Sequence, residues 1–372
     1  MALTSREQIC DRESDVRRGG APQPGPSLRA IARTLRPPRR TLAMRRWLPA
    51  NLSLGPGRPE VTWLDLAGIK FEEPFFRDTV LRARASKPPA AERKTGLQPL
   101  LRALEGGESL IEPSGIIFHI SRCGSTLLGN ALRLADGCTV LSEPGPVNEV
   151  LLADLSSVPS SSHWEHGDIR GGILKALVHV LGDSGGERRQ VVLKLTSWNI
   201  LLISRVRSLW PDVPIVTMTR DPTEVAVSNL LEPSTWLKQI KNSPKEASRI
   251  FGWHENNSLL MSTAEFNARV IGCYCRAAQQ PGLMARILDY DELDSAAVRE
   301  VGEMFGLRLP KRDEGRMGEI FRTYAKDPLG KRPFKDDRRR KQEAADSRLR
   351  AAIEQWASGD YLRLRAQSNR RA

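Results

Sequence analysis

The middle of the chain alternates between short apolar runs and stretches with helical periodicity. Residues 116–120 form a mostly apolar run rich in β-branched side chains, typical of a strand covered on both faces. The runs 191–195 and 214–219 have the same character, whereas 127–134 and 200–210 carry apolar side chains at helical spacing. Because strands and helices alternate, the pattern predicts an α/β fold with a parallel central sheet flanked by helices.

The ends of the chain differ from its middle. The N-terminal 43 residues are rich in Arg, Pro, Gly and Ser without a sustained apolar period, so we expect a disordered basic tail. Met44 precedes the first segment dense in hydrophobic residues. The sequence supports equally that translation begins at Met44 and that the preceding residues are a functional basic tail. The polar, proline-containing stretch 84–96 predicts a linker. We divide the chain into a tail, an N-terminal accessory segment too short for its own core, a main domain and a basic C-terminal helical segment: 1–43, 44–110, 111–335 and 336–372.

The formal net charge is +13, from 57 Lys and Arg against 44 Asp and Glu. Much of the excess lies near the ends; residues 307–372 hold 19 Lys or Arg against 10 acids. Since the motifs described below lie mostly between the basic ends, we expect no specific nucleic-acid partner.

Two further features concern the compartment. The sequence lacks the roughly 18 uninterrupted apolar residues of a membrane span and the apolar region of a secretory signal. Its cysteines are odd in number and form no zinc or disulfide pattern: Cys10, Cys123, Cys138, Cys273 and Cys275. We therefore expect a cytoplasmic protein without a metal, while its oligomeric state stays open.

The segment 121–126 stands between a predicted strand and a predicted helix. Backbone N–H groups at such a helix start are unpaired and favour an anion. Gly124 allows close approach, Ser125 and Thr126 offer hydroxyls, and Arg122 adds a full charge. The segment lacks the G-x-x-x-x-G-K-[ST] spacing of nucleotide triphosphatases, which favours a phosphate handled without metal. A plain strand-turn-helix junction, capped by its Ser and Thr, stays open.

A second polar segment follows the predicted strand 214–219 and leads into a helix. Its sequence is Arg-Asp-Pro-Thr-Glu-Val-Ala-Val-Ser, residues 220–228. Arg220 at the strand end and Ser228 two turns into the helix can meet on one side of that helix and share a phosphate. A simple turn with a salt bridge would not require Ser228.

Together the two segments resemble the donor site of sulfotransferases. Residues 121–128 resemble the 5′-phosphosulfate loop P-[KR]-S-G-[ST]-T-x-[LW], with Ser121 for Pro and Cys123 for Ser, and 220–228 resemble the 3′-phosphate motif R-[ND]-P-x-[DE]-x-x-x-S. The resemblance covers 111–335 and implies a P-loop NTPase-like sulfotransferase fold. It also implies 3′-phosphoadenosine-5′-phosphosulfate (PAPS) as co-substrate.

The resemblance further implies a set of donor-binding residues. Residues 288–293 are similar to a family segment whose Tyr lies near the adenine. Residues 329–331, with Lys326 and Lys335, lie where the family has a late basic loop that closes on the 3′-phosphate. Cys123 would lose a hydroxyl contact. The implied set is Arg122, Cys123, Gly124, Ser125, Thr126, Leu127, Arg220, Ser228, Tyr290 and Lys331.

The catalytic base is implied by a different segment. Many sulfotransferases use a His in K-T-H, but residues 194–196 are Lys-Leu-Thr, which keep Lys194 and lack the His. Glu143, in Ser-Glu-Pro, is similar to the glutamate base of protein-tyrosine and trehalose-type sulfotransferases. The implied catalytic set is therefore Glu143, Arg122 and Lys194. Glu149 is a spare candidate, and His119 is expected to be buried structure; helix capping or pairing with Arg122 stays open for Glu143.

These features predict sulfonate transfer to a hydroxyl or amine acceptor of unknown identity. The alternatives are an ATP-dependent P-loop kinase, a non-catalytic protein that binds PAPS or adenosine 3′,5′-bisphosphate (PAP), and a nucleic-acid binder acting through the Arg-rich ends. We expect the acceptor to meet segments 154–189 and 232–258. The segment 47–110 also resembles the N-terminal extension of some bacterial sulfotransferase-like proteins.

Overall fold

The structure is a computed structural model. It describes residues 47–55, 58–65, 70–105, 110–153, 168–183, 190–254, 257–327 and 329–368. All of them belong to one compact unit of the chain, residues 39–372. The predictions for the tail 1–43 and for Met44 lie outside the described residues.

A five-stranded parallel sheet forms the centre of this unit. Its strands are β4 (Pro113–His119), β5 (Cys138–Ser142), β6 (Gln190–Lys194), β7 (Ile215–Thr219) and β8 (Arg286–Asp289), in the order β5-β6-β4-β7-β8. Nearly all of their side chains are buried, as expected for short apolar strands covered on both faces. The predicted α/β fold with a parallel sheet is confirmed, and the three predicted strands correspond to β4, β6 and β7.

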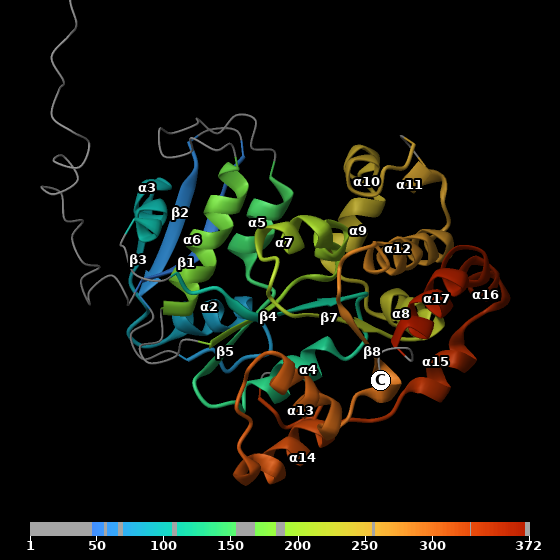
Figure 1. Ribbon diagram of the computed structural model, residues 1–372. Helices are drawn as coiled ribbons and strands as arrows, with labels where there is room; N and C mark the ends of the chain where they lie inside the picture. Colours follow the sequence, from blue (N-terminus) through green and yellow to red (C-terminus); the bar gives the residue numbers. More distant parts are fainter. Residues whose placement is uncertain are drawn as a thin grey trace, which may run out of the picture. The chain divides into compact units, whose positions relative to one another are not determined.

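Helices cover both faces of the sheet (Figure 1). One face carries α4 (Ser125–Leu132), α13 (Ser295–Met304) and α14 (Glu314–Arg322). The other carries α5 (Gly145–Leu152), α6 (Ile169–Asp183), α7 (Ile203–Leu209) and α12 (Thr263–Ala278). The stretch 200–210, predicted as one helix, begins within a 3₁₀ helix, η3 (Ser197–Leu202), before α7 continues it.

Shorter elements complete the connections. α8 (Pro222–Leu231) follows β7 and packs on α12. The rest are α9 (Thr235–Lys241), α10 (Pro244–Phe251), α11 (Asn257–Leu260), η4 (Tyr290–Glu292) and η5 (Lys311–Asp313).

The accessory segment forms a second, antiparallel sheet with two helices. Its elements are β1 (Trp47–Ser53), β2 (Glu60–Asp65), α2 (Phe76–Ala85), β3 (Glu92–Thr95), α3 (Gln98–Leu101) and η2 (Arg102–Leu104), and β1 packs on α5 and α6. The linker predicted at 84–96 is wrong, because β3 lies within it and pairs with β2. Its polar residues form a strand through partners in β2: Trp63 Nε1 donates to Thr95 Oγ1 at 2.8 Å.

The C-terminal helices belong to the same packed body. They are α15 (Arg338–Ala344), α16 (Ser347–Ile353), the π-helical turn η6 (Glu354–Ser358) and α17 (Gly359–Ser368). α15 packs on α8, and α17 packs on β8. At that contact Tyr361 Oη and Thr219 Oγ1 both donate to Oδ2 of Asp289, at 2.8 and 2.9 Å. The C-terminal segment thereby holds the strand that ends just before Tyr290.

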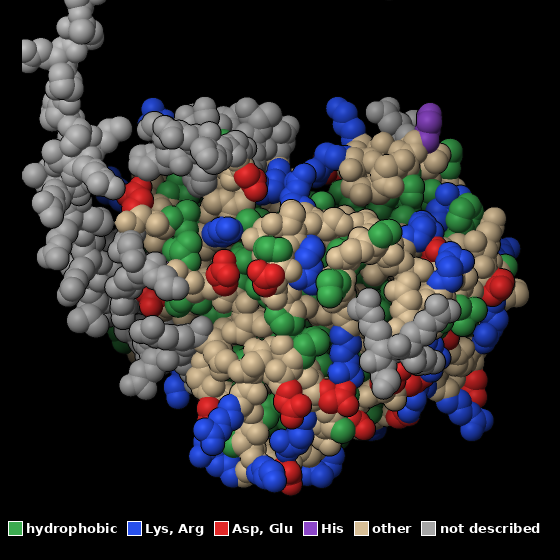
Figure 2. Space-filling view, viewed as in Figure 1, with side chains coloured by type: hydrophobic (Ala, Val, Ile, Leu, Met, Phe, Trp, Pro, Cys, Tyr) green, Lys and Arg blue, Asp and Glu red, His purple; other side chains and the backbone are tan. Residues whose placement is uncertain are grey.

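The surface shows two further properties. On the face drawn in Figure 2, Lys and Arg side chains are interspersed with Asp and Glu rather than gathered in one patch. Within the described residues, no helix has the length and apolar character needed to cross a membrane.

Candidate functional site

One cavity lies at the carboxyl edge of the parallel sheet, where sheets of this kind place ligands. Its volume is about 380 Å³. Each of the five strands is followed by residues that line it. These residues are Ser121–Leu127 after β4, Glu143 after β5, Thr196 and Ser197 after β6, Arg220 after β7, and Tyr290 after β8.

The loop between β4 and α4 has an unusual backbone. Ser121 and Arg122 have φ values of 77° and 52°, and Gly124 has 80°. Such left-handed conformations cost roughly 1–2 kcal/mol in a residue with a Cβ, and they gather at functional sites. Gly124 is the N-cap of α4 and no side chain caps the helix, so the alternative of Ser and Thr caps is wrong here. Ser125, Thr126 and Leu127, the first residues of α4, line the cavity.

Cys123 directs its thiol away from the cavity. The side chain is fully buried, and Sγ lies 3.4 Å from the carbonyl oxygen of Met218, to which it donates. Burial raises the pKa of this thiol to about 12. In this orientation the Cys123 thiol packs inside the protein.

Arg122 crosses the mouth of the cavity towards the end of α8. Its Nη2 donates to Oε2 of Glu232 at 2.6 Å and lies 3.5 Å from the carbonyl oxygen of Ser228. The hydrogen bond and charge of Arg122 lower the pKa of Glu232. The alternative in which Arg122 pairs with Glu143 is thus not the observed one.

Glu143 pairs instead with Lys194. The Nζ of Lys194, which is fully buried, lies 2.5 Å from Oε1 of Glu143, and Nε2 of His119 lies 3.6 Å from the same oxygen. Burial raises the pKa of Glu143, but Lys194 and His119 lower it by a larger amount, so the pKa lies well below the usual carboxyl range. Glu143 lines the cavity, whereas Lys194 does not and contacts it through Glu143.

Two neighbouring residues have structural partners. Oε1 of Glu149, the spare candidate for the base, accepts from the backbone N–H of Leu54 at 3.3 Å, and Glu149 does not line the cavity. Thr196, which follows β6, accepts a hydrogen bond at 2.6 Å from Asn148 and does line the cavity.

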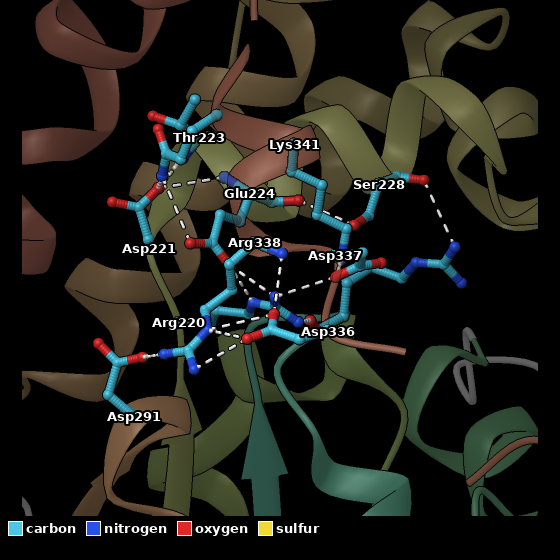
Figure 3. A network of polar contacts seen from close by, with 12 residues as sticks. Arg220, Asp221, Thr223, Glu224, Ser228, Asp291, Asp336, Asp337, Arg338 and Lys341 are labelled. Atoms are coloured by element: carbon cyan, nitrogen blue, oxygen red, sulfur yellow. Dashed lines mark hydrogen bonds and ion pairs between the residues drawn. The ribbon is translucent and has the colours of Figure 1, made fainter. Parts of the chain in front are cut away.

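A second cluster of charge surrounds Arg220 (Figure 3). The Arg220 guanidinium is buried, donates through Nε to Glu224 at 2.7 Å, and lies 4.0 Å above the ring of Tyr290. Ser228 Oγ donates to the Glu224 carbonyl oxygen at 2.8 Å. Arg220 and Ser228 thus line the same cavity as the loop before α4.

Of the basic residues around 326–335, Lys326 lines the cavity and Lys331 does not. Lys331 is exposed and does not line the cavity. Lys326 does line it, and burial, followed by the charge of Arg122, lowers the Lys326 pKa to about 8. Sequence reasoning missed Arg340 and Lys341 on α15, which also line the cavity. Their signal was the run of four basic residues 338–341, in which the buried Lys341 lies 2.8 Å from Asp337.

The predicted acceptor segments are only partly present at the site. Of 232–258, the cavity is lined by Glu232, Ser234 and Trp236. Trp253 instead stacks on Phe251, with ring centroids 4.4 Å apart. Of 154–189, residues 154–167 and 184–189 lie outside the described residues, and the remainder is mostly α6.

Comparisons with known proteins give distant likenesses. No protein-family model and no curated protein matches the chain. Among solved structures, a sulfotransferase from Alicyclobacillus acidocaldarius matches at 17% identity and a TM-score of 0.33, over 65% of this chain and 96% of that one. A sulfotransferase from Mycobacterium avium matches at 14% identity and a TM-score of 0.37, over 70% of this chain and 79% of that one.

Proposed function

We propose that this chain is a sulfotransferase that moves a sulfonate group from PAPS to a hydroxyl or amine acceptor. The observation that carries the proposal is that two groups of basic and polar residues line one cavity. The start of α4 with Arg122 offers the first, and Arg220 with Lys341 offers the second. PAPS carries its charge in two matching places, the 5′-phosphosulfate and the 3′-phosphate.

In this proposal each donor group has its own partners. The N–H groups at the start of α4 and the hydroxyls of Ser125 and Thr126 bind the 5′-phosphosulfate. Arg220, Ser228 and Lys341 bind the 3′-phosphate. Tyr290 stands between the two sites: its ring packs against Gly124, where a Cβ would lie 2.7 Å from Tyr290 Cδ2, and against the Arg220 guanidinium. This position suits an adenine stacked on the ring.

The residues of the cavity then supply the chemistry. The acceptor oxygen or nitrogen attacks sulfur, the sulfur–oxygen bond to the 5′-phosphate breaks, and its electron pair leaves with PAP. Glu143 takes the acceptor proton, while Arg122 and Lys326 neutralise charge on the sulfonate oxygens. Lys194 acts through Glu143, since its ammonium binds that carboxylate rather than lining the cavity.

The rival functions make different demands on ligands. An ATP-dependent P-loop kinase would use a lysine in the loop, where residues 121–126 have none, and would not need Ser228. A non-catalytic binding protein would use the same donor site without turnover. Calorimetric titration with PAP, and with ATP plus Mg²⁺, separates the kinase from the other two. Release of PAP from PAPS, tested with a panel of phenols, sugars and amines, separates the enzyme from the binding protein.

We expect PAP to bind and Arg220→Ala to weaken that binding by about 10- to 100-fold, because a charge-assisted contact to phosphate is lost. Arg249→Ala is the control, since Arg249 pairs with Glu246 at 2.6 Å on α10 and does not line the cavity. Binding of ATP plus Mg²⁺ without binding of PAP would contradict the proposal.

A further inference from the structure

His119 is the last residue of β4, and its side chain is only 7% exposed. Its Nδ1 accepts the backbone N–H of Ser121 at 3.1 Å, and its Nε2 faces Glu143 Oε1 at 3.6 Å. Within the described residues Nε2 has no partner at hydrogen-bond distance. A buried N–H without a hydrogen-bond partner costs about 1–3 kcal/mol, so the unpartnered Nε2 at the edge of the cavity needs an explanation.

The hydrogen bond at Nδ1 fixes the tautomer of the imidazole. Because Nδ1 accepts from the Ser121 N–H, its lone pair is occupied and the ring proton of the neutral form sits on Nε2. Burial lowers the pKa of His119, although Glu143 raises it, so the ring is neutral at neutral pH. The charged groups that face the ring are Glu143, Lys194 and Lys326.

This tautomer excludes His119 as the proton acceptor in the reaction. A second proton could enter only at Nδ1, where it would displace the Ser121 N–H and disturb the loop before α4. The Nε2–H is a donor, and Oε1 of Glu143 is the acceptor that it faces.

We propose that His119 is a positioning residue that donates Nε2–H to Oε1 of Glu143 and, with Lys194, directs the other carboxylate oxygen towards the acceptor. Hydrogen bonds of this kind are often long before substrate binds and shorten in the reacting complex. Oε1 already accepts from Lys194, and this leaves Oε2 of Glu143 as the oxygen for the acceptor in our proposal. The inference rests on the proposed function, in which Glu143 is the base.

Two substitutions separate this role from a structural one. In His119→Gln the side-chain amide can reach Glu143 but no longer caps the Ser121 N–H; in His119→Asn the amide oxygen can accept from Ser121 but the donor to Glu143 is lost. We expect His119→Asn to lower kcat for PAPS turnover by about 10- to 100-fold through misplacement of the base, with KM for PAPS unchanged. We expect His119→Gln to keep most of kcat.

The pH dependence provides an independent readout. Since the bond from His119 lowers the pKa of Glu143, its removal raises that pKa. The acid limb of kcat in His119→Asn therefore moves to higher pH, whereas that of His119→Gln stays near the wild-type position. Infrared difference spectra between each protein and its Glu143→Gln counterpart follow the titration of the Glu143 carboxyl directly. This measurement needs no turnover.

His179 on α6 offers a matched control. It is equally buried, and its Nδ1 accepts the backbone N–H of Ile111 at 3.1 Å, but it does not line the cavity. His179→Asn should leave kcat and the Glu143 titration unchanged. The inference is overturned if His119→Gln loses kcat while His119→Asn keeps it, or if the Glu143 titration is the same in His119→Asn and wild type. If the wild-type protein binds PAP but turns over no donor, the proposed function fails, and the infrared titration still decides whether His119 holds Glu143.

Discussion

The pairing of Glu143 with Lys194 decides how the carboxylate that we propose as the base titrates. Lys194 is fully buried and its charge is compensated by one carboxylate oxygen at 2.5 Å. Because the pKa of Glu143 is depressed in the folded state, the stability that this pairing contributes is present above the ordinary carboxyl pKa. It is lost only as the pH falls through the lower, folded-state pKa.

Lys194→Met should therefore act on both stability and titration. Burial, which raises the pKa of Glu143, is then opposed by His119 without Lys194, so this pKa rises, and the protein loses about 3–5 kcal/mol of unfolding free energy at neutral pH. Chemical denaturation at several pH values measures the loss. Adding Glu143→Gln should restore part of it, because no buried charge is then left unpaired. Lys94→Met, which breaks the surface pair with Glu60 at 2.9 Å, should change little; equal losses in both variants would refute this account.

Gly124 meets two demands at one position. Its φ is 80°, and an added Cβ would lie 2.7 Å from the Tyr290 ring. Gly124→Ala should destabilise the fold through the left-handed backbone, by about 1–2 kcal/mol, and also displace the ring, which weakens PAP binding. Gly137→Ala is the matched control, since Gly137 has a φ of 66° and nothing within 4 Å of an added Cβ. PAP affinity lost equally in both variants would show that the ring contact is irrelevant.

At the scale of elements, the sequence predicted what depends on local pattern. The strands at β4, β6 and β7 were predictable because each is a continuous apolar run. β8, with four residues, is too short to carry a period of its own. β3 is polar and exists through its pairing with β2, so a composition rule assigned it to a linker.

The candidate site divides in the same way. Residues that directly follow a strand, such as Glu143, Arg220 and Tyr290, were within reach of sequence motifs, and all three line the cavity. Lys341 could not be predicted from a motif, because its place at the cavity depends on how α15 packs against α8, which is far away in the sequence. The orientation of the Cys123 thiol also depends on packing, which no spacing rule describes.

α15 brings Lys341 to the cluster around Arg220, which gives a prediction for that helix. Lys341→Met should weaken PAP binding about tenfold and leave adenosine 5′-monophosphate binding unchanged, because one contact to the 3′-phosphate is lost. Calorimetric titration with the two nucleotides measures the difference. Arg339→Met is the control on the same helix, since the Arg339 side chain is 92% exposed and pairs with Glu343. An equal effect on both nucleotides would place Lys341 elsewhere than at the 3′-phosphate.

At the scale of the whole molecule, the C-terminal helices support the cavity from outside the sheet. Tyr361 on α17 donates to Asp289, the last residue of β8, and Tyr290 follows directly. Tyr361→Phe should lower the unfolding free energy by about 1.5–3 kcal/mol, because a hydrogen bond to a buried carboxylate is lost. Thermal and chemical denaturation measure it, with Leu362→Ala, 62% exposed on the same helix, as the control. An unchanged unfolding free energy in Tyr361→Phe would mean that α17 contributes nothing through this bond.

The walls of the cavity have two origins. The residues proposed to hold the donor mostly follow strands of the parallel sheet, whereas Phe75 comes from the accessory segment and Trp236 from α9. On the proposed function, these two apolar side chains would face the acceptor. A related protein with a different accessory segment could then accept a different substrate and keep the same donor-binding residues. On the same proposed function, grafting foreign accessory segments onto residues 111–368 would change which acceptor is sulfated and keep the residues proposed to bind the donor.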